Sequence, residues 1–372
     1  MIEPFIHDPL LPRVIFGSGT LTRLGPEVER LGARRVLVLS TPGRAEAQAD
    51  GIAAALGERS AGVFAGAVMH TPVEVTEAAL RVVKERGADA LVAVGGGSTT
   101  GLGKAIALRT DLPQIVLPTT YAGSEMTPIL GETIDGAKTT RRDPKVLPEV
   151  VIYDVDLTLD LPAGISAASG MNAMAHAVEA LYARDRNPLV SLAAEAGIAA
   201  LARALPRIMA APRDGEVRAE ALYGAWLCGF CLGTVGMALH HKLCHVLGGA
   251  FALPHAETHA IVLPHAAAYN APAAPAAMAR VARALGMEDA ARGLYDLAGR
   301  LGLKRGLREV GMPEDGIAVA VERTLGGPYW NPRPLERGAI RDLLARAWRG
   351  EPPGSAPDGP GPEAGGIGRD GA

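Results

Sequence analysis

Apolar and polar positions follow two different rhythms in the two halves of the chain. In the first half, short runs rich in Val, Ile and Leu alternate with longer segments whose apolar residues recur every three or four positions. The short runs predict strands and the longer segments predict helices, because these spacings bring apolar side chains to a buried face. The expected strands are residues 14–16, 36–40, 62–64, 90–94, 114–117 and 150–153, and the expected helices are 20–31, 45–56, 73–86 and 99–108.

Strands separated by helices predict a parallel sheet with helices on its faces, the Rossmann-like α/β arrangement that binds dinucleotides. One short antiparallel insertion is also expected. Asp135-Gly136 lies between Thr133 and Thr139, and an Asp-Gly pair between strand-like residues is typical of a hairpin turn.

The second half of the chain shows only the periodicity of helices. Segments rich in Ala and Leu recur, with Gly and Pro between them, at residues 188–209, 215–233, 273–285, 288–301, 315–325 and 335–348. The end of the chain is rich in Pro and Gly without periodicity, which is typical of disorder. We therefore expect an α/β domain at 1–158, an all-α domain at 159–350 and a disordered tail at 351–372.

A glycine-rich turn is the sharpest feature of the first half. Gly95, Gly96, Gly97 and Ser98 follow the strand expected at 90–94 and precede a helix. Glycines let backbone N–H groups approach an anion, and a helix N-terminus adds the positive end of its dipole. The alternative is a plain strand-to-helix turn, but three consecutive glycines exceed what a turn requires. A pyrophosphate site is the preferred interpretation, although the common G-x-G-x-x-G pattern is absent.

Hydroxyl residues follow two further strands at the edge where open α/β sheets bind ligands. Thr119 and Thr120 come after the strand at 114–117, and Ser40 ends the strand at 36–40. Thr119 and Thr120 could face the adenine, ribose or nicotinamide of a cofactor, or merely cap the next segment, and Ser40 is a further candidate at the cofactor. Thr41 and Arg44 come next, with no acidic residue to bind a ribose 2′-hydroxyl. This leaves room for a 2′-phosphate, so NADPH is expected to be accepted alongside NADH.

Histidines gather in the second half. His240, His241, His245 and His255 lie within sixteen residues, and helical spacing places His241 and His245 on one face. Asn172 and His176 repeat the four-residue spacing on another expected helix. Each histidine alone is more simply a surface or hydrogen-bonded core residue. The joint pattern favours a metal or proton-transfer site.

Composition narrows the class of protein. The chain has 37 basic and 40 acidic residues and no long basic run, which disfavours nucleic-acid partners. No signal peptide or run of about eighteen apolar residues is evident, so we expect a cytoplasmic protein with no membrane contact. Cys228 and Cys231 form a C-x-x-C, but an apolar helical setting favours buried thiols over a redox or zinc site.

Taken together, these motifs resemble the iron-dependent (group III) alcohol dehydrogenases. The resemblance spans nearly all of residues 1–350 and is closest to the branch that reduces maleylacetate. It is carried by four segments: Gly95 to Lys104, Pro118 to Thr127, the His240-His241-Lys242-Leu243-Cys244-His245 run, and Trp330-Asn331-Pro332-Arg333-Pro334.

The resemblance implies a dehydroquinate synthase-like architecture and a homodimer. It implies that the glycine turn binds the NAD(P) pyrophosphate, and that Thr119, Thr120, Ser124 and Thr127 line the cofactor site. In the family, an Asp and three His bind a divalent metal. Here Asn172 stands at the Asp position, and Gly101 replaces a common acidic residue. We therefore expect no metal; if one binds, its ligands would be Asn172, His176, His241 and His255.

The implied reaction is the NAD(P)H-dependent reduction of the C=C bond of maleylacetate to 3-oxoadipate in aromatic compound catabolism. Hydride addition would leave an enolate, which hydrogen-bond donors or imidazolium groups can stabilise. His241, His245 and His255 are the candidates for enolate stabilisation and protonation, and His176 should line the same pocket. Lys242 and Arg333 are candidate partners for the substrate carboxylates, although either is equally a solvated charge.

Two other functions stay open at this point. One is a metal-dependent iron or zinc alcohol dehydrogenase acting on a small alcohol or aldehyde, against which Asn172 argues. The other is a non-catalytic nucleotide-binding or sensor protein on the same scaffold.

Overall fold

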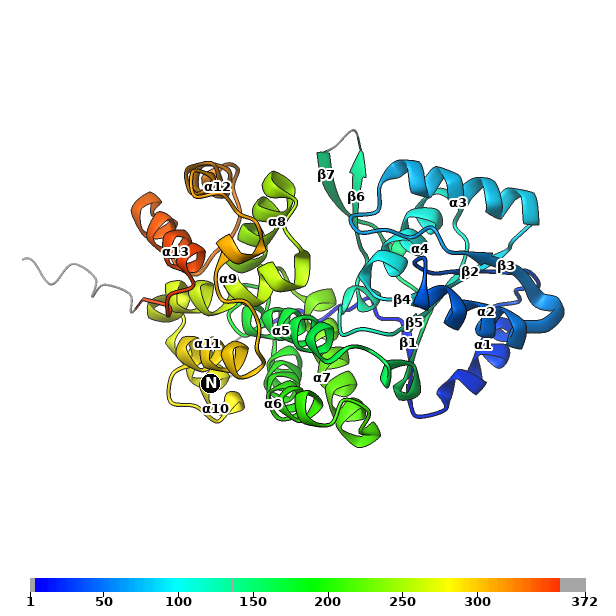
Figure 1. Cartoon of the computed structure of the whole chain (residues 1–372), viewed down its shortest axis with the longest axis horizontal. Coiled ribbons are helices and arrows are strands. Elements are labelled where there is room, and N and C mark those ends of the chain that lie inside the picture. Colours follow the sequence, from blue (N-terminus) through cyan, green and yellow to red (C-terminus); the bar gives the residue numbers. More distant parts are fainter. Residues whose placement is uncertain (1–3, 135–136, 355–372) are drawn as a thin grey trace, which may run out of the picture.

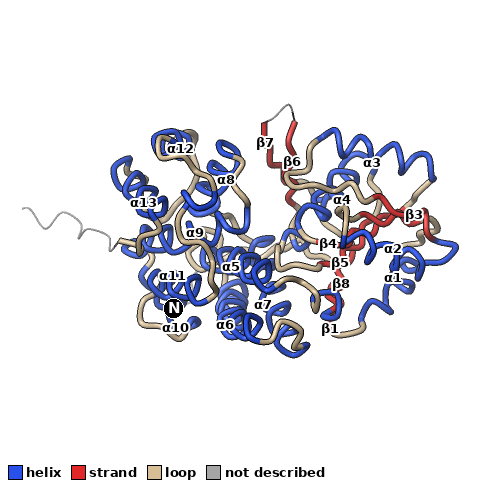
Figure 2. The backbone as a smooth tube through the Cα atoms, in the orientation of Figure 1, coloured by secondary structure: helices blue, strands red, loops and turns tan. Residues whose placement is uncertain are grey.

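The computed structural model describes residues 4–134 and 137–354 and contains a six-stranded parallel sheet in its first half. The strand order is β1-β8-β5-β4-β2-β3. The strands are β1 Arg13–Gly17, β2 Val36–Leu39, β3 Ser60–Phe64, β4 Ala90–Gly95, β5 Gln114–Pro118 and β8 Val150–Asp154. The six strands expected from the apolar runs are thus confirmed, and they lie together in one half of the molecule (Figure 2). Because neighbouring strands are parallel, their carboxyl ends share one edge of the sheet.

Helices cover both faces of this sheet. Val36 and Val38 point to the face covered by α1 Leu24–Arg30 and α2 Arg44–Leu56. Leu37 and Leu39 point to the face covered by α3 Val73–Arg86 and α4 Gly97–Thr110. The alternation follows from the two-residue period of a strand, and strands buried on both faces become continuously apolar.

An antiparallel hairpin projects from this domain near the helical half (Figure 1). It consists of β6 Ile129–Ile134 and β7 Ala137–Arg142, which pair in register from Ile129 with Arg142 to Ile134 with Ala137. The expected hairpin is confirmed. Its predicted turn, Asp135-Gly136, lies outside the described residues, as do residues 355–372 of the predicted tail.

After Thr158 the described chain is helical. The helices are α5 Ala163–Ala180, α6 Pro188–Ala210, α7 Gly215–Thr234, α8 Leu239–Phe251, α9 His255–Asn270, α10 Pro275–Leu285, α11 Ala290–Arg300, α12 Gly316–Leu325 and α13 Arg337–Arg349. One apolar cluster joins α5, α6 and α7 to α9, α10 and α11, and a second joins α8 and α9 to α12 and α13. Cys228 and Cys231 are buried free thiols in the first cluster, as expected.

Helix α6 is long and apolar enough, by length and composition alone, to cross a membrane. Half of its most apolar window is buried, and Val190, Ile198 and Leu201 lie in the core shared with α5 and α7. Helices α7 and α8, counted together as one segment, are also long and apolar enough to cross a membrane, but the chain bends by 93° between them. The packing of α6 is that of a core helix in a globular domain.

The two domains meet where the carboxyl edge of the sheet faces α5 and α7. Val116, Val151 and Tyr153 of the sheet belong to the apolar cluster of the helical domain. On the hairpin, Arg142 donates to the carbonyl oxygen of Gly233 at the end of α7, at 3.0 Å. The functional residues described below lie on both sides of this junction.

Candidate active site

The glycine turn forms the corner between β4 and α4. Gly95 has a φ of 150°, and a Cβ atom there would lie 2.5 Å from Thr99 Oγ1. A Cβ atom on Gly96 would lie 2.8 Å from Thr120 Oγ1. Helix α4 starts at Gly97, two residues earlier than expected, and no side chain caps its N-terminus. Its first N–H groups therefore remain available to an anion.

The hydroxyl residues expected at the cofactor occupy two different settings. Thr119 and Thr120 are half-buried beside the corner, and the Thr119 N–H donates to the Gly95 carbonyl oxygen at 3.0 Å. Ser40 is buried, and its hydroxyl lacks a partner among the described residues. Ser98 is half-buried on the first turn of α4.

Ser124 and Thr127 instead face the α4 side chain Lys104. Lys104 Nζ lies 3.0 Å from Thr127 Oγ1 and 3.4 Å from Ser124 Oγ. The Thr127 hydroxyl also donates to the Ser124 carbonyl oxygen at 3.0 Å. Ser124 and Thr127 therefore make contacts within the loop after β5, whereas Thr119 and Thr120 lie beside the glycine corner.

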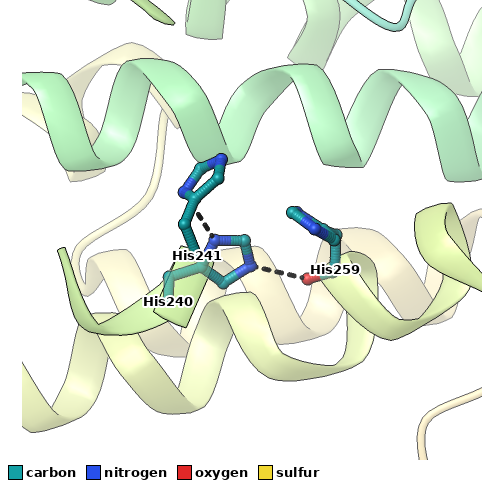
Figure 3. Close-up of side chains that lie close together, drawn as sticks. All are labelled: His240, His241 and His259. Carbon is teal, nitrogen blue, oxygen red and sulfur yellow. Dashed lines mark hydrogen bonds between the residues drawn. The ribbon is translucent and has the colours of Figure 1, made fainter. Parts of the chain in front are cut away.

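Three helices bring imidazole rings together in the helical domain. His176 of α5 lies 5.1 Å from His241 of α8, measured between ring centroids. His259 of α9 lies 5.2 Å from His241, 4.8 Å from His240 and 4.2 Å from His255. Figure 3 shows His240, His241 and His259 turned toward one another between their helices.

Several polar atoms in this cluster are buried without partners among the described residues. They are Asn172 Oδ1, His176 Nδ1, His241 Nε2 and both ring nitrogens of His259. Buried polar groups are normally hydrogen-bonded. Such a concentration at one place is typical of a site that receives water or a ligand group.

Glu179 fixes the start of α8 and the orientation of His241. This carboxylate is fully buried one turn after His176 on α5. It accepts N–H groups from Ala238 and His240, both at 2.9 Å, and from His241 Nδ1 at 2.7 Å. Because Nδ1 donates to Glu179, the Nε2 lone pair of His241 faces the cluster. Tyr182 donates to the same carboxylate at 3.2 Å.

Burial keeps these imidazoles neutral. Desolvation lowers the pKa of His240 to about 4, with His241 adding to the shift and Glu179 opposing it. Desolvation, followed by the neighbouring His245, lowers the pKa of His241 to about 3. The pKa values of His176 and His259 are also well below the ordinary value, mainly through burial. At neutral pH each of these rings therefore offers one N–H and one lone pair.

The remaining predicted residues lie around this cluster. His245 is exposed on α8, with its ring 6.3 Å from that of His241. His255 is half-buried at the start of α9. Lys242 points to the loop after α12, where Nζ donates to the Gly326 carbonyl oxygen at 3.2 Å and lies 5.4 Å from the Tyr329 ring centre.

Arg333, the other predicted carboxylate partner, is engaged with α9. Its guanidinium donates to the Tyr269 carbonyl oxygen at 3.1 Å and lies 4.5 Å from the centre of that ring. Asn331 exchanges side-chain hydrogen bonds with Asn270 at 2.8 and 3.0 Å. The Trp330 to Pro334 segment thus anchors the loop before α13 to α9.

Sequence reasoning missed Glu179, His259 and the inward orientation of His240. Two signals were present. Glu179 follows His176 by three residues, and His259 follows His255 by four, so each pair shares one helix face. Nothing in the spacing indicates that three separate helices converge, which requires the tertiary packing.

The four ligands predicted for a metal do not form one donor group among the described residues. Asn172 provides a neutral amide, and the nearby carboxylate of Glu179 is occupied by hydrogen-bond donors. Among the described residues, His240, His241 and His259 each bring a ring nitrogen within 4.8 Å of the others, and this group could hold a metal ion. That group shares only His241 with the four candidate ligands.

Two features together indicate the class of protein: the glycine corner at Gly95 to Ser98, and the histidine-rich helical domain. Residues 12–155 match the family model for iron-containing alcohol dehydrogenase, and residues 166–348 match its C-terminal counterpart. The chain belongs to the iron-containing alcohol dehydrogenase family. The predicted family and architecture are therefore confirmed.

Within the family, the chain is similar to several maleylacetate reductases. It is 55% identical to the maleylacetate reductase of Rhizobium sp. (strain MTP-10005), over 95% of this chain and 100% of the relative. It is 57% identical to that of Sphingobium indicum, over 94% and 99%. The crystal structure of maleylacetate reductase from Agrobacterium tumefaciens matches with a TM-score of 0.91 and 55% identity, over 95% and 100% of the two chains.

Proposed function

We propose that the protein reduces the C=C bond of maleylacetate to give 3-oxoadipate, with NADH or NADPH as the hydride donor. The observation that carries this proposal is the similarity to maleylacetate reductases at 55% and 57% identity over nearly the whole chain. The buried imidazole cluster, with Asn172 in place of an acidic ligand, agrees with a reaction that does not rely on a metal.

The substrate chemistry explains how such a site works. Maleylacetate is a dicarboxylate with a ketone conjugated to its alkene. Hydride from the nicotinamide adds to the alkene carbon β to the ketone, and the electron pair of the alkene moves to make an enolate. The ketone oxygen becomes negative until a proton from a donor reaches the α carbon. Donors aimed at that oxygen stabilise the transition state.

We assign these tasks to the predicted histidines. His176 and His241 are buried and neutral. Because the N–H of His241 is donated to Glu179, His241 presents a lone pair to the pocket, and His176 is the proposed N–H donor to the enolate oxygen. His245 is exposed, which allows it to exchange protons with water and to serve as the proton source. His255, at the start of α9, packs against His259 and is proposed to line the same substrate pocket. Lys242 remains a proposed partner for a substrate carboxylate.

The nicotinamide cofactor is proposed to bind across the glycine corner. Its pyrophosphate would meet the N–H groups of Gly96, Gly97 and Ser98, with Thr119 and Thr120 beside it. Gly123 brings the loop after β5 against the histidine site, because a Cβ atom there would lie 3.3 Å from His176 Nδ1. The loop after β5, which carries Thr119, Thr120 and Gly123, therefore lies against the histidine site of the helical domain.

The test is an assay of nicotinamide absorbance with maleylacetate, repeated after exhaustive chelation. We expect oxidation of NADH or NADPH, formation of 3-oxoadipate by mass spectrometry, and no effect of the chelator. Activity restricted to alcohol oxidation with added iron or zinc would instead support the metal-dependent alternative. Nicotinamide binding without turnover of any oxo-acid would support a sensor protein.

We also propose a cytoplasmic homodimer. β1 is an edge strand of the sheet, and an unpaired edge is a template for association. Large apolar side chains are exposed around it, including Phe16 at 36% and Leu10 at 47%. Phe16 also packs edge-on against Tyr223 of α7, with ring centres 6.3 Å apart. A second copy would cover this surface.

A further inference from the structure

Lys104 is a buried amine outside the histidine site, and burial lowers the pKa of its ammonium group to about 7. It lies on α4, two turns after the glycine corner, and is 0% exposed. Its Nζ atom donates to the carbonyl oxygens of Ser124, Thr127 and Ile129 at 2.6, 2.7 and 2.9 Å. These three carbonyls match the three N–H bonds of an ammonium group. No carboxylate lies within hydrogen-bond distance of Nζ in the described part of the chain.

The loop held by Lys104 spans residues 119–129 and touches both halves of the proposed active site. At its start, Thr120 lies against Gly96 of the glycine corner. In its middle, Gly123 has a φ of 80°, and a Cβ atom there would lie 3.2 Å from Gly229 Cα on α7. The same atom would lie 3.3 Å from His176. The loop is thus a spacer between the cofactor corner and a catalytic histidine.

We propose that Lys104 is a positioning residue that sets the distance between the bound nicotinamide and His176. It acts through the loop at 119–129 and touches neither group itself. An apolar side chain in its place would leave three buried carbonyl oxygens without donors, and the loop would lose the contacts that hold it against α4. This inference rests on the proposed function only for its kinetic test.

The experiment uses Lys104→Met in the full chain, with Lys84→Met on the exposed face of α3 as the matched control. We expect single-turnover hydride transfer to maleylacetate to slow about 100-fold, the size of effect caused by a misplacement of about 1 Å. The NADH dissociation constant, measured by fluorescence, should change little because the glycine corner stays intact. Lys84→Met should behave as the parent protein.

Hydrogen–deuterium exchange gives a readout that needs no substrate. Amides of residues 119–129 should exchange faster in Lys104→Met, whereas those of β4 should not. If the Met variant does not fold, Lys104→Gln keeps two N–H donors and should show a smaller change in the same direction.

Three results would overturn the inference: unchanged exchange in the loop, unchanged hydride transfer, or a loss confined to NADH affinity. The last would mean that the charge attracts the cofactor phosphates. A parent protein that is inactive on maleylacetate would count against the proposed function alone, because the exchange measurement would still decide the role of Lys104.

Discussion

At the scale of single residues, the site depends on one buried carboxylate. Glu179 orients His241 through a 2.7 Å hydrogen bond and caps α8 through two N–H groups. Glu179→Gln would place an amide N–H against one of these donors. We expect kcat to fall about 10- to 100-fold, as for other residues that orient a catalytic imidazole. Steady-state kinetics would check this, with the partly exposed Glu220→Gln as control. Equal kcat values in the parent and the Glu179 variant would contradict the assigned role.

Residue burial also predicts a dependence of stability on pH. The pKa values of His240 and His241 fall to about 4 and about 3 in the folded protein, mainly through desolvation. Below an unfolded-state pKa of about 6.5, only the unfolded chain gains protons at these sites, so stability falls as pH decreases. At pH ~5.5 each imidazole should cost about 1 kcal/mol of unfolding free energy relative to pH ~7.5.

Urea unfolding at the two pH values measures this loss. Replacing His240 by Phe should reduce the difference in unfolding free energy between the two pH values by about 1 kcal/mol, the contribution of one imidazole. An unfolding free energy that is the same at both pH values would mean that the rings are charged or accessible in the folded state.

Most of the elements could be predicted from the sequence, because apolar periodicity reports directly on burial. The helix at Val73–Arg86 was predicted with its observed bounds. The start of α4 was placed two residues late, since glycine is a poor helix former and its propensity gives no hint that a strand leads straight into a helix at Gly97. The shared pocket of His176 and His241 was expected from the family resemblance, but the approach of His259 could not be predicted, because it depends on how α5, α8 and α9 pack.

The turn between β2 and α2 carries a prediction about cofactor choice. Thr41 follows buried Ser40 and precedes Gly43, whose φ is 83°. An acidic residue at this turn would accept the ribose 2′-hydroxyl of NADH and repel the 2′-phosphate of NADPH. We expect Thr41→Asp to raise the KM for NADPH about tenfold or more, with that for NADH little changed. Paired kinetics with both cofactors test this, and an equal effect on both would place the 2′ position elsewhere.

At the scale of the whole molecule, the exposed edge strand β1 and the apolar residues around it predict association of two copies. Light scattering coupled to gel filtration should give twice the chain mass of 38.4 kDa. Phe16→Glu should shift the protein toward the monomer, because a charge would have to be buried at the interface. A monomeric parent protein at micromolar concentration would contradict the proposed assembly.

We propose that a reduced nicotinamide binds to the α/β domain and that the imidazole pocket of the helical domain stabilises the enolate. The most direct test is the position of the transferred hydride. With nicotinamide deuterated at the transferable C4 position, NMR should show one deuterium on the product carbon β to the ketone and none at the α carbon. Deuterium on the carbonyl carbon, giving an alcohol, would contradict the account and indicate alcohol dehydrogenase chemistry.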